Sequence, residues 1–115
     1  MHNTSVVSHL IYVRASAGNS ARLGARLSTL VGPSSKAFGC LHFALQKSLT
    51  EDDLWVIHGG WADESAMNDW VAAPELKVFA ELMSERLVKS LDFQTFASVA
   101  TTRSACGWPT ERLAG

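Results

Sequence analysis

Apolar and polar residues recur along the chain with two different periods, and these periods predict its secondary structure. Residues 5–15 are rich in β-branched and aromatic side chains, which favours an extended strand, and the largely apolar stretches 39–49 and 55–61 are expected to form the second and third strands. Residues 91–99 alternate apolar and polar side chains and are expected to form a further strand. The polar run 50–53 is expected to turn the second strand into the third.

Two stretches between these strands carry apolar residues at helical spacing. The first helix is expected to begin at Asn19 or Ser20, whose side chains can accept hydrogen bonds from free backbone N–H groups. It is expected to end at Gly32–Pro33, because glycine followed by proline is a common helix stop. Its predicted buried stripe consists of Leu23, Leu27, Leu30 and Val31.

A second helix is expected after the third strand, in two pieces separated by Pro74. Asp63 is expected to cap its start, because a carboxylate there accepts from the first backbone N–H groups. The second piece is expected to end near Ser90. The predicted apolar stripes are Ala66, Met67, Trp70 and Val71 in the first piece and Leu76, Phe79, Ala80, Met83 and Leu87 in the second.

The resulting order, strand–helix–strand–strand–helix–strand, predicts an α+β fold of the ferredoxin-like, split βαβ type. Such a fold has a four-stranded antiparallel sheet with both helices on one face. Because the strands carry apolar residues on both faces, the face without helices needs a second cover. We therefore predict a homodimer that packs the two open sheet faces together as a dimeric α+β barrel. Residues 1–99 would form this domain, and residues 100–115 an extended or flexible C-terminal tail.

The composition agrees with one globular domain and argues against several functions. The 115 residues are 47% apolar and carry a net charge of −1, with no basic run that would suit nucleic acid. No apolar stretch has the length of a membrane span, and the N-terminus lacks the features of a signal peptide. Cys40 and Cys106 show no CxxC spacing, so we expect reduced thiols in a cytoplasmic protein rather than a disulfide.

Candidate chemistry gathers at the end of the third predicted strand. Trp61 shares a strand face with Ile57 and Gly59, and a small residue beside a large indole leaves room for a flat, apolar slot. Trp61 could equally fill the core beneath the helix. Trp70 lies on a regular apolar stripe, which favours core packing.

The sequence AFGCLHFAL, followed by a hairpin and then by GGWADESAMNDWVAAPELKVF, resembles the antibiotic biosynthesis monooxygenase family of small dimeric α+β barrels. The resemblance runs from Val7 to Val99. It implies the dimeric barrel fold. It also implies an activity from a set that includes cofactor-free oxygenation of aromatic polyketides or quinols and haem degradation, although many members of the family have no known activity.

The residue correspondence that the resemblance implies is mixed. Trp61 stands where the cofactor-free oxygenases keep a pocket-lining tryptophan, and Trp70 stands where the haem-degrading branch keeps a functional one. The haem-degrading branch also has an Asn at the position of Ile11 and an axial His at that of Ala80, so haem degradation is not expected here. The cofactor-free branch has an Asn at the position of Ile57 and an Arg near Ala80, and neither is present.

His9 is the candidate catalytic base. It shares a strand face with Ile11 and Val13 that the family comparison places under the helices, so it would project toward the slot beside Trp61. A neutral imidazole there can take a proton from a phenol or hydroquinone. The resulting anion can pass an electron to O2 while a donor such as the Trp61 indole N–H holds the oxyanion. The substrate pocket would be lined by Ile11, Ile57, Gly59, Trp70 and Phe79.

Each histidine has a second interpretation, as a buried polar residue bonded to a neighbouring strand. His58 has the opposite strand phase to Trp61 and would face the interior of the dimeric barrel, whereas the phase of His42 is open. Tyr12 points away from the slot and suits an interface. No HxH or HxxE spacing supports a metal site, so neither a metal nor a cofactor is expected.

Two functions therefore remain open. The first is a cofactor-independent monooxygenase that oxidises an aromatic, quinol-like or polyketide-like small molecule with O2, with His9 and Trp61 as its catalytic residues. The second is a non-catalytic dimeric barrel that binds an apolar small ligand, which the missing Asn, Arg and His favour. In both cases the expected partners are a second copy of the chain and a small molecule, with no nucleic acid and no membrane.

Overall fold

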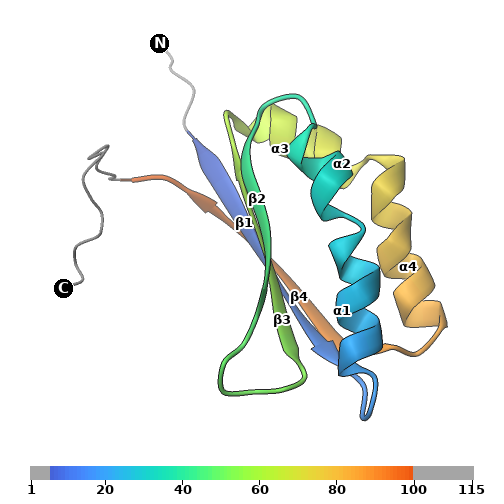
Figure 1. Ribbon diagram of the computed structural model, residues 1–115. Coiled ribbons are helices and arrows are strands. Elements are labelled where there is room, and N and C mark those ends of the chain that lie inside the picture. Colours follow the sequence, from blue (N-terminus) through green and yellow to red (C-terminus); the bar gives the residue numbers. More distant parts are fainter. Residues whose placement is uncertain (1–5, 100–115) are drawn as a thin grey trace.

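The structure, a computed structural model, describes residues 6–99 (Figure 1). Its strands are β1 (Val7–Ala15), β2 (Cys40–Lys47), β3 (Leu54–Trp61) and β4 (Val88–Ala97). Its helices are α1 (Ser20–Ser28), α2 (Val31–Ser35), α3 (Glu64–Val71) and α4 (Lys77–Ser84), with the 3-10 turn η1 (Pro74–Leu76) before α4.

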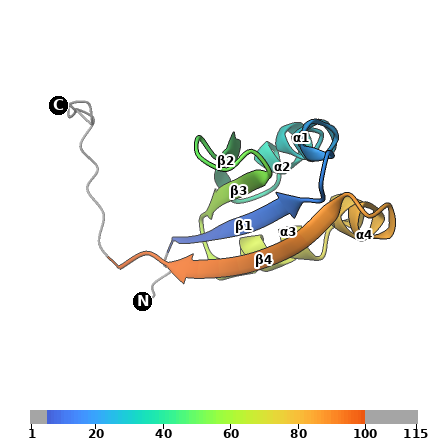
Figure 2. The ribbon, with the colours of Figure 1, turned by 90° about the horizontal axis from the view of Figure 1, so that it is seen from below.

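The four strands form one antiparallel sheet in the order β2–β3–β1–β4, and the helices lie on one of its faces (Figure 1). Figure 2 shows β1 and β4 side by side along their length, in agreement with their pairing from Val7 to Ala15. The predicted α+β, ferredoxin-like fold with split βαβ order is therefore confirmed. The predicted tail, residues 100–115, lies outside the described residues, so the domain boundary at residue 99 stays a prediction.

β1 lies inside the sheet, and its alternation decides which side chains face the helices. Every odd-numbered residue from Val7 to Ala15 is buried, whereas the even-numbered residues between them are half-buried. The antiparallel register places four residues of β3 on the same covered face: Trp55, Ile57, Gly59 and Trp61. His9 is fully buried on this face, as predicted.

The first helical segment differs from the prediction, because it breaks before Gly32–Pro33. α1 ends at Ser28, and the short α2 contains both residues. Pro33 is tolerated there because it lies in the first turn of α2, where a backbone N–H has no partner within the helix. Of the predicted stripe, Val31 is only half-buried, while the other members are buried: Leu23, Leu27 and Leu30.

α3 begins as predicted, whereas the apolar face of α4 is shifted. The Asp63 carboxylate accepts a hydrogen bond from the backbone N–H of Ala66 at 2.9 Å and caps α3. Pro74 opens η1, whose tighter rotation of about 3.0 residues per turn turns the following helix relative to a continuous α-helix. Leu82 is therefore the fully buried residue of α4, while Met83 is 52% exposed. Two other predicted stripe residues are exposed: Val71 and Ala80.

α4 ends earlier than predicted, at Ser84, and β4 begins at Val88. The backbone N–H of Leu87 donates to the carbonyl of Leu82 at 3.1 Å, which closes the helix in a Schellman-type turn. Arg86 adopts the left-handed conformation that this turn requires, with φ of 62°. The turn frees three more residues for the fourth strand than the alternation of residues 91–99 suggested.

The second face of the sheet carries no helix in the described part of the chain (Figure 1). The strand registers place several apolar side chains on it: Leu10, Tyr12, Leu54, Val56 and Phe96. Phe96 is 43% exposed in the single chain. This agrees with the predicted pattern of apolar residues on both faces, and the homodimer stays a prediction.

Candidate functional site

Aromatic rings surround the imidazole of His9 on the covered face of the sheet. Trp70 stacks on the imidazole, with ring centroids 4.6 Å apart and an angle of 7° between the planes. Phe43 meets it edge-on at 5.8 Å, Phe93 stacks at 5.7 Å, and Trp61 lies at 6.2 Å. We call His9 and these four residues the His9 cage. The cage brings together His9, Trp61 and Trp70, which come from β1, β3 and α3.

Gly59 makes room for the imidazole. It lies directly opposite His9 in the register of β1 and β3. A Cβ atom at Gly59 would come within 2.3 Å of Cε1 of His9, so a larger residue would have to displace the ring. The space predicted beside Trp61 is therefore filled by the His9 side chain, and no open slot lies over Gly59.

One hydrogen bond determines the tautomer of His9. Nε1 of Trp61 donates to Nδ1 of His9 at 3.0 Å, and both side chains are fully buried. An indole nitrogen can only donate, so Nδ1 must be the acceptor. A neutral imidazole then carries its hydrogen on the other nitrogen, which makes Nε2 a donor. Nε2 is buried and has no hydrogen-bond partner among the described residues.

His9 is held in its neutral form. Its pKa is lowered from 6.5 to about 4, chiefly by the loss of solvent on burial and further by the imidazoles of His58 and His42. A group whose conjugate acid has so low a pKa is a weak base and is a poor acceptor for the proton of a phenol. Its one lone pair is also engaged by Trp61. The geometry therefore gives little support to the predicted role of His9 as a general base.

The remaining predicted lining residues lie around the cage and farther along the core. Ile11 and Ile57 pair across β1 and β3 on the covered face, next to the His9–Gly59 pair, and both are buried. Phe79 is half-buried on α4 and packs against the core. Ile11 and Ile57 thus adjoin His9, while Phe79 belongs to the helix layer.

The sequence analysis missed Phe43, Phe93 and Ser34. Phe43 pairs with Gly59 across β2 and β3, so it falls on the covered face, and the register with β1 places Phe93 there as well. The strand registers would have revealed both residues, but they are not evident from one sequence. Ser34 is buried on α2 and accepts a hydrogen bond from Nε1 of Trp70 at 2.9 Å.

Trp70 separates His9 from the surface on the side of α2 and α3. Its indole stacks on His9 and also lines a groove of about 180 Å³ between these helices. Phe38, which is 91% exposed, lies at the same groove. A ligand that reaches His9 from this groove must displace the indole of Trp70, which Ser34 holds in place.

A second pair of imidazoles lies on the open face of the sheet. His42 Nε2 and His58 Nδ1 are 3.3 Å apart, and the ring of His42 lies over Gly60. The pKa of His58 is lowered, chiefly by the loss of solvent on burial and to a smaller extent by the neighbouring imidazole of His42. The register confirms that His58 faces away from Trp61, and it places His42 on the same face as His58.

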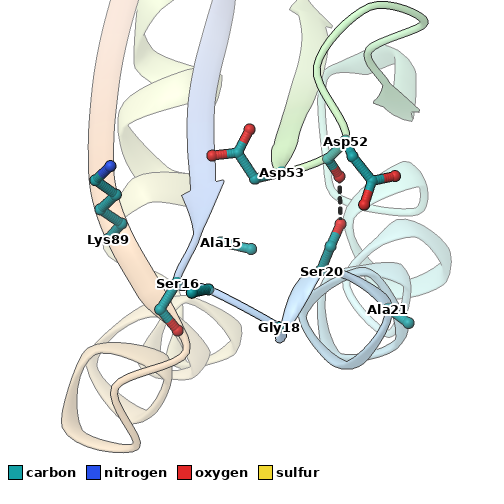
Figure 3. Close-up of a pocket in the computed structure, with 9 residues that line it drawn as sticks. Ala15, Ser16, Gly18, Ser20, Ala21, Asp52, Asp53 and Lys89 are labelled. Atoms are coloured by element: carbon teal, nitrogen blue, oxygen red, sulfur yellow. Dashed lines mark hydrogen bonds between the residues drawn. The ribbon is translucent and has the colours of Figure 1, made fainter.

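A larger hollow of about 500 Å³ lies at the other end of β1 (Figure 3). Its wall includes Asp52 and Asp53, and Ser20 Oγ donates to the Asp52 backbone carbonyl. The carboxylates are already paired, that of Asp52 with Lys47 at 2.8 Å and that of Asp53 with Arg14 at 3.3 Å. With the charged side chains of Asp52, Asp53 and Lys89 in its wall, this hollow suits a flat, apolar ligand less well than the His9 cage does.

Three further findings bear on the sequence predictions. Among residues 6–99, no group of three or more His, Cys, Asp and Glu side chains is placed to hold a metal ion. Within the same range, no helix is long and apolar enough to cross a membrane. Burial raises the pKa of the Cys40 thiol, and the other cysteine, Cys106, lies outside the described residues.

Comparison with known proteins identifies a family. Residues 6–82 match the family model described as antibiotic biosynthesis monooxygenase. This match covers the sheet strands β1 to β3 and the helices that contribute Trp70 and Ser34. No curated protein matches the chain significantly in sequence.

Solved structures of low sequence identity share the fold. A protein from Pseudomonas aeruginosa has a TM-score of 0.77 and 21% identity, covering 87% of this chain and 100% of that one. A candidate antibiotic biosynthesis monooxygenase from Deinococcus radiodurans has a TM-score of 0.76 and 22% identity, covering 86% and 97%. A mutant of SnoaB, a cofactor-independent oxygenase from Streptomyces nogalater, has a TM-score of 0.74 and 17% identity, covering 87% and 99%.

The lowered pKa of His9 predicts a loss of stability in acid. Between the unfolded pKa of 6.5 and the folded value of about 4, the unfolded chain binds more protons, so stability falls as the pH falls through this range. From neutral pH to pH 4 the free energy of unfolding should fall by roughly 3 kcal/mol, because each pH unit between the two pKa values is worth about 1.4 kcal/mol. Urea unfolding of wild type and His9→Gln at both pH values measures it, because glutamine does not titrate. An equal acid dependence in the two proteins would contradict the assignment to His9.

Proposed function

The chain belongs to the antibiotic biosynthesis monooxygenase family, and from this premise we propose that it is a cofactor-independent monooxygenase. Its substrate is an aromatic, quinol-like or polyketide-like small molecule that reacts with O2 at the His9 cage. The observation that carries the proposal is the buried Nε2 of His9, which lacks a partner among the described residues and lies within a group of aromatic rings. Such surroundings suit the oxygen atom of a flat aromatic ligand.

The proposed reaction needs no cofactor, because the substrate supplies the electrons. In a hydroxyanthrone, for example, the CH2 group activated by neighbouring aromatic rings and a carbonyl loses a proton and becomes a delocalised carbanion. The carbanion passes one electron to O2, the two radicals combine to a peroxide anion, and this anion takes back a proton to become a hydroperoxide. Loss of water then leaves a new carbonyl, so one oxygen atom enters the product and the other leaves as water. The protein contributes binding, orientation and a dry site in which hydrogen bonds are strong.

The residues of the cage have separate parts in this proposal. Trp61 orients His9 through the indole–imidazole hydrogen bond, and His9 contacts the substrate oxygen. Trp70 yields its stacking position or shares it with the substrate ring. The apolar side chains beside them exclude water from the reacting anion: Ile11, Ile57, Phe43 and, from the helix layer, Phe79.

A second candidate function, binding of an apolar ligand without turnover, is favoured by the closed state of the cage. His9 and Trp61 are fully buried and Trp70 is only 3% exposed, so a ligand reaches His9 only after Trp70 moves. The positions at which the cofactor-free oxygenases keep an Asn and an Arg hold Ile57 and Ala80 here. A protein with this site could hold a ligand in its buried, water-free interior without ever activating O2.

The proposed assembly is a homodimer that packs through the open face of the sheet. Members of the family are generally dimeric. The open face carries Leu10, Tyr12 and Val56, which single-chain packing leaves half-buried. Removal of such apolar area from water favours pairing at about 25 cal/mol per Å².

Oxygen uptake tests the proposed reaction. Purified protein should consume O2 with a hydroxyanthrone or a hydroquinone, and Trp61→Phe should lower kcat/KM by about 10- to 100-fold because it removes the indole donor. Trp55→Phe is the matched control, since the indole of Trp55 donates to Ser20 Oγ at 3.1 Å, outside the cage. Equal losses in both variants would contradict the proposed site. Tight binding with no turnover across the panel would favour the second candidate function.

Solution mass tests the assembly. Light scattering should give twice the chain mass of 12.5 kDa for the wild type. Val56→Glu should shift the protein to the monomer, because it buries a charge in the proposed interface. Val71→Glu should remain dimeric, since Val71 is 43% exposed on α3, away from the open face. A monomeric wild type, or a Val56→Glu protein that stays dimeric, would rule out this interface.

A further inference from the structure

We propose that His9 acts in this site as a neutral hydrogen-bond donor whose Nε2–H holds the anionic oxygen of an enolate or phenolate, with Trp61 as its positioning residue. The inference rests on the proposed function and narrows the substrate class. It selects molecules that ionise on their own near neutral pH, such as fused-ring ketones and phenols with a delocalised anion.

The geometry assigns the two nitrogens of His9 opposite parts. Nδ1 accepts from Nε1 of Trp61 at 3.0 Å, so its lone pair is in use. The proton of the neutral ring is therefore on Nε2. A ring fixed in this tautomer can donate to a ligand, but it has no free lone pair with which to accept a proton from one.

The second observation is that this donor is buried without an acceptor. Nε2 has no hydrogen-bond partner among the described residues, and the side chain has no exposed surface. Buried donors without acceptors are uncommon because they cost free energy, and they often mark a place that a ligand or a water completes. A ligand oxygen within hydrogen-bond distance of Nε2 would remove this cost.

No other group of the cage can serve as a base. The rings around His9 belong to Phe43, Phe93, Trp61 and Trp70, none of which takes up a proton. The nearby imidazoles of His42 and His58 lie on the opposite face of the sheet. The substrate must therefore give its proton to solvent and bind as the anion.

An anion of this kind fits an apolar cage better than a compact ion does. Its charge is spread over fused rings, which reduces the cost of leaving water, and the rings can stack on an indole such as that of Trp70. The remaining charge on oxygen is held by Nε2–H in surroundings of low dielectric constant, where a charge-assisted hydrogen bond is strong. Neutral imidazole donors that stabilise substrate oxyanions are an established catalytic device.

Nitrogen-15 NMR tests the assignment without any turnover. In the resting protein, His9 should show a protonated Nε2 and an unprotonated Nδ1, and Trp61→Phe should convert it to a mixture of tautomers. Trp55→Phe should leave the signals unchanged. A resting His9 protonated on Nδ1 would overturn the proposal.

The anaerobic complex tests the contact with the ligand. When a dihydroxyanthrone is added without O2, the Nε2 proton of His9 should move downfield, as expected for a bond to an anionic oxygen. Only the anion binds. Below the pKa of the ligand, the affinity should therefore rise about tenfold for each unit by which the pH is raised. Absence of binding, or saturation with no change at Nε2, would overturn the proposal.

Kinetics separate the donor role from the base role. His9→Gln keeps an N–H donor and cannot act as a base, so it should retain kcat/KM within about tenfold, whereas His9→Leu should lose about 100- to 1000-fold. The pH profile of kcat/KM should follow the pKa of each substrate and remain the same in His9→Gln. Equal losses in the two variants would overturn the donor role. If His9→Leu does not fold, the His9→Gln profile still decides.

The two proposals fail in distinguishable ways. If no substrate of the panel consumes O2, the proposed monooxygenase function fails, while the NMR signals and the anaerobic complex still report on the donor role. If turnover occurs but depends on a group that titrates in the enzyme and is lost in His9→Gln, the function stands and the donor role fails.

Discussion

The pairing of His9 with Gly59 across β1 and β3 is the constraint on which the site depends. This register places the imidazole over a residue without a side chain and brings Trp61, two residues along β3, within hydrogen-bond distance of Nδ1. A slip of one residue in this pairing would place His9 and the indole of Trp61 on opposite faces of the sheet. A larger residue at position 59 would push the ring out of its place. The position, tautomer and burial of His9 thus follow from one set of backbone hydrogen bonds.

Burial gives His9 two properties at once. The loss of solvent lowers its pKa to about 4 and so keeps it neutral, and the same dry surroundings strengthen any hydrogen bond that Nε2 makes. The unpaired donor costs stability, about 1–3 kcal/mol for a group of this kind, which the surrounding apolar core can bear. The imidazoles of His42 and His58 act on His9 through the sheet. A partner that covers the open face would therefore also change the electrostatic surroundings of His9.

The spacing of apolar residues, together with the residues that cap helices or form turns, was sufficient to predict the fold. The errors in the predicted elements have identifiable causes. The Asp63 cap and the four strands follow from local chemistry that one sequence displays, whereas the resemblance to the family was needed to place the face of His9 under the helices. The shifted face of α4 follows from the 3-10 turn η1. The early end of α4 follows from Arg86, which adopts a left-handed conformation that is usually found at glycine and so could not be read from the sequence. The slot beside Gly59 was predicted empty because spacing shows that a residue is small but not what fills the space. Phe43 and Ser34 required the register of β2 and the position of α2, which depend on tertiary contacts.

The central claim is that the ligand site is the cage of aromatic rings around His9. The most direct test is an anaerobic titration of nitrogen-15-labelled protein with a dihydroxyanthrone, followed through the indole N–H signals of the tryptophans. Trp61 and Trp70 contact His9. Trp55 lies at the other end of β3, where its indole N–H donates a hydrogen bond to Ser20 of α1. The account predicts that the signals of Trp61 and Trp70 shift together and saturate while that of Trp55 stays in place. Shifts confined to Trp55, with Trp61 and Trp70 unchanged, would contradict it.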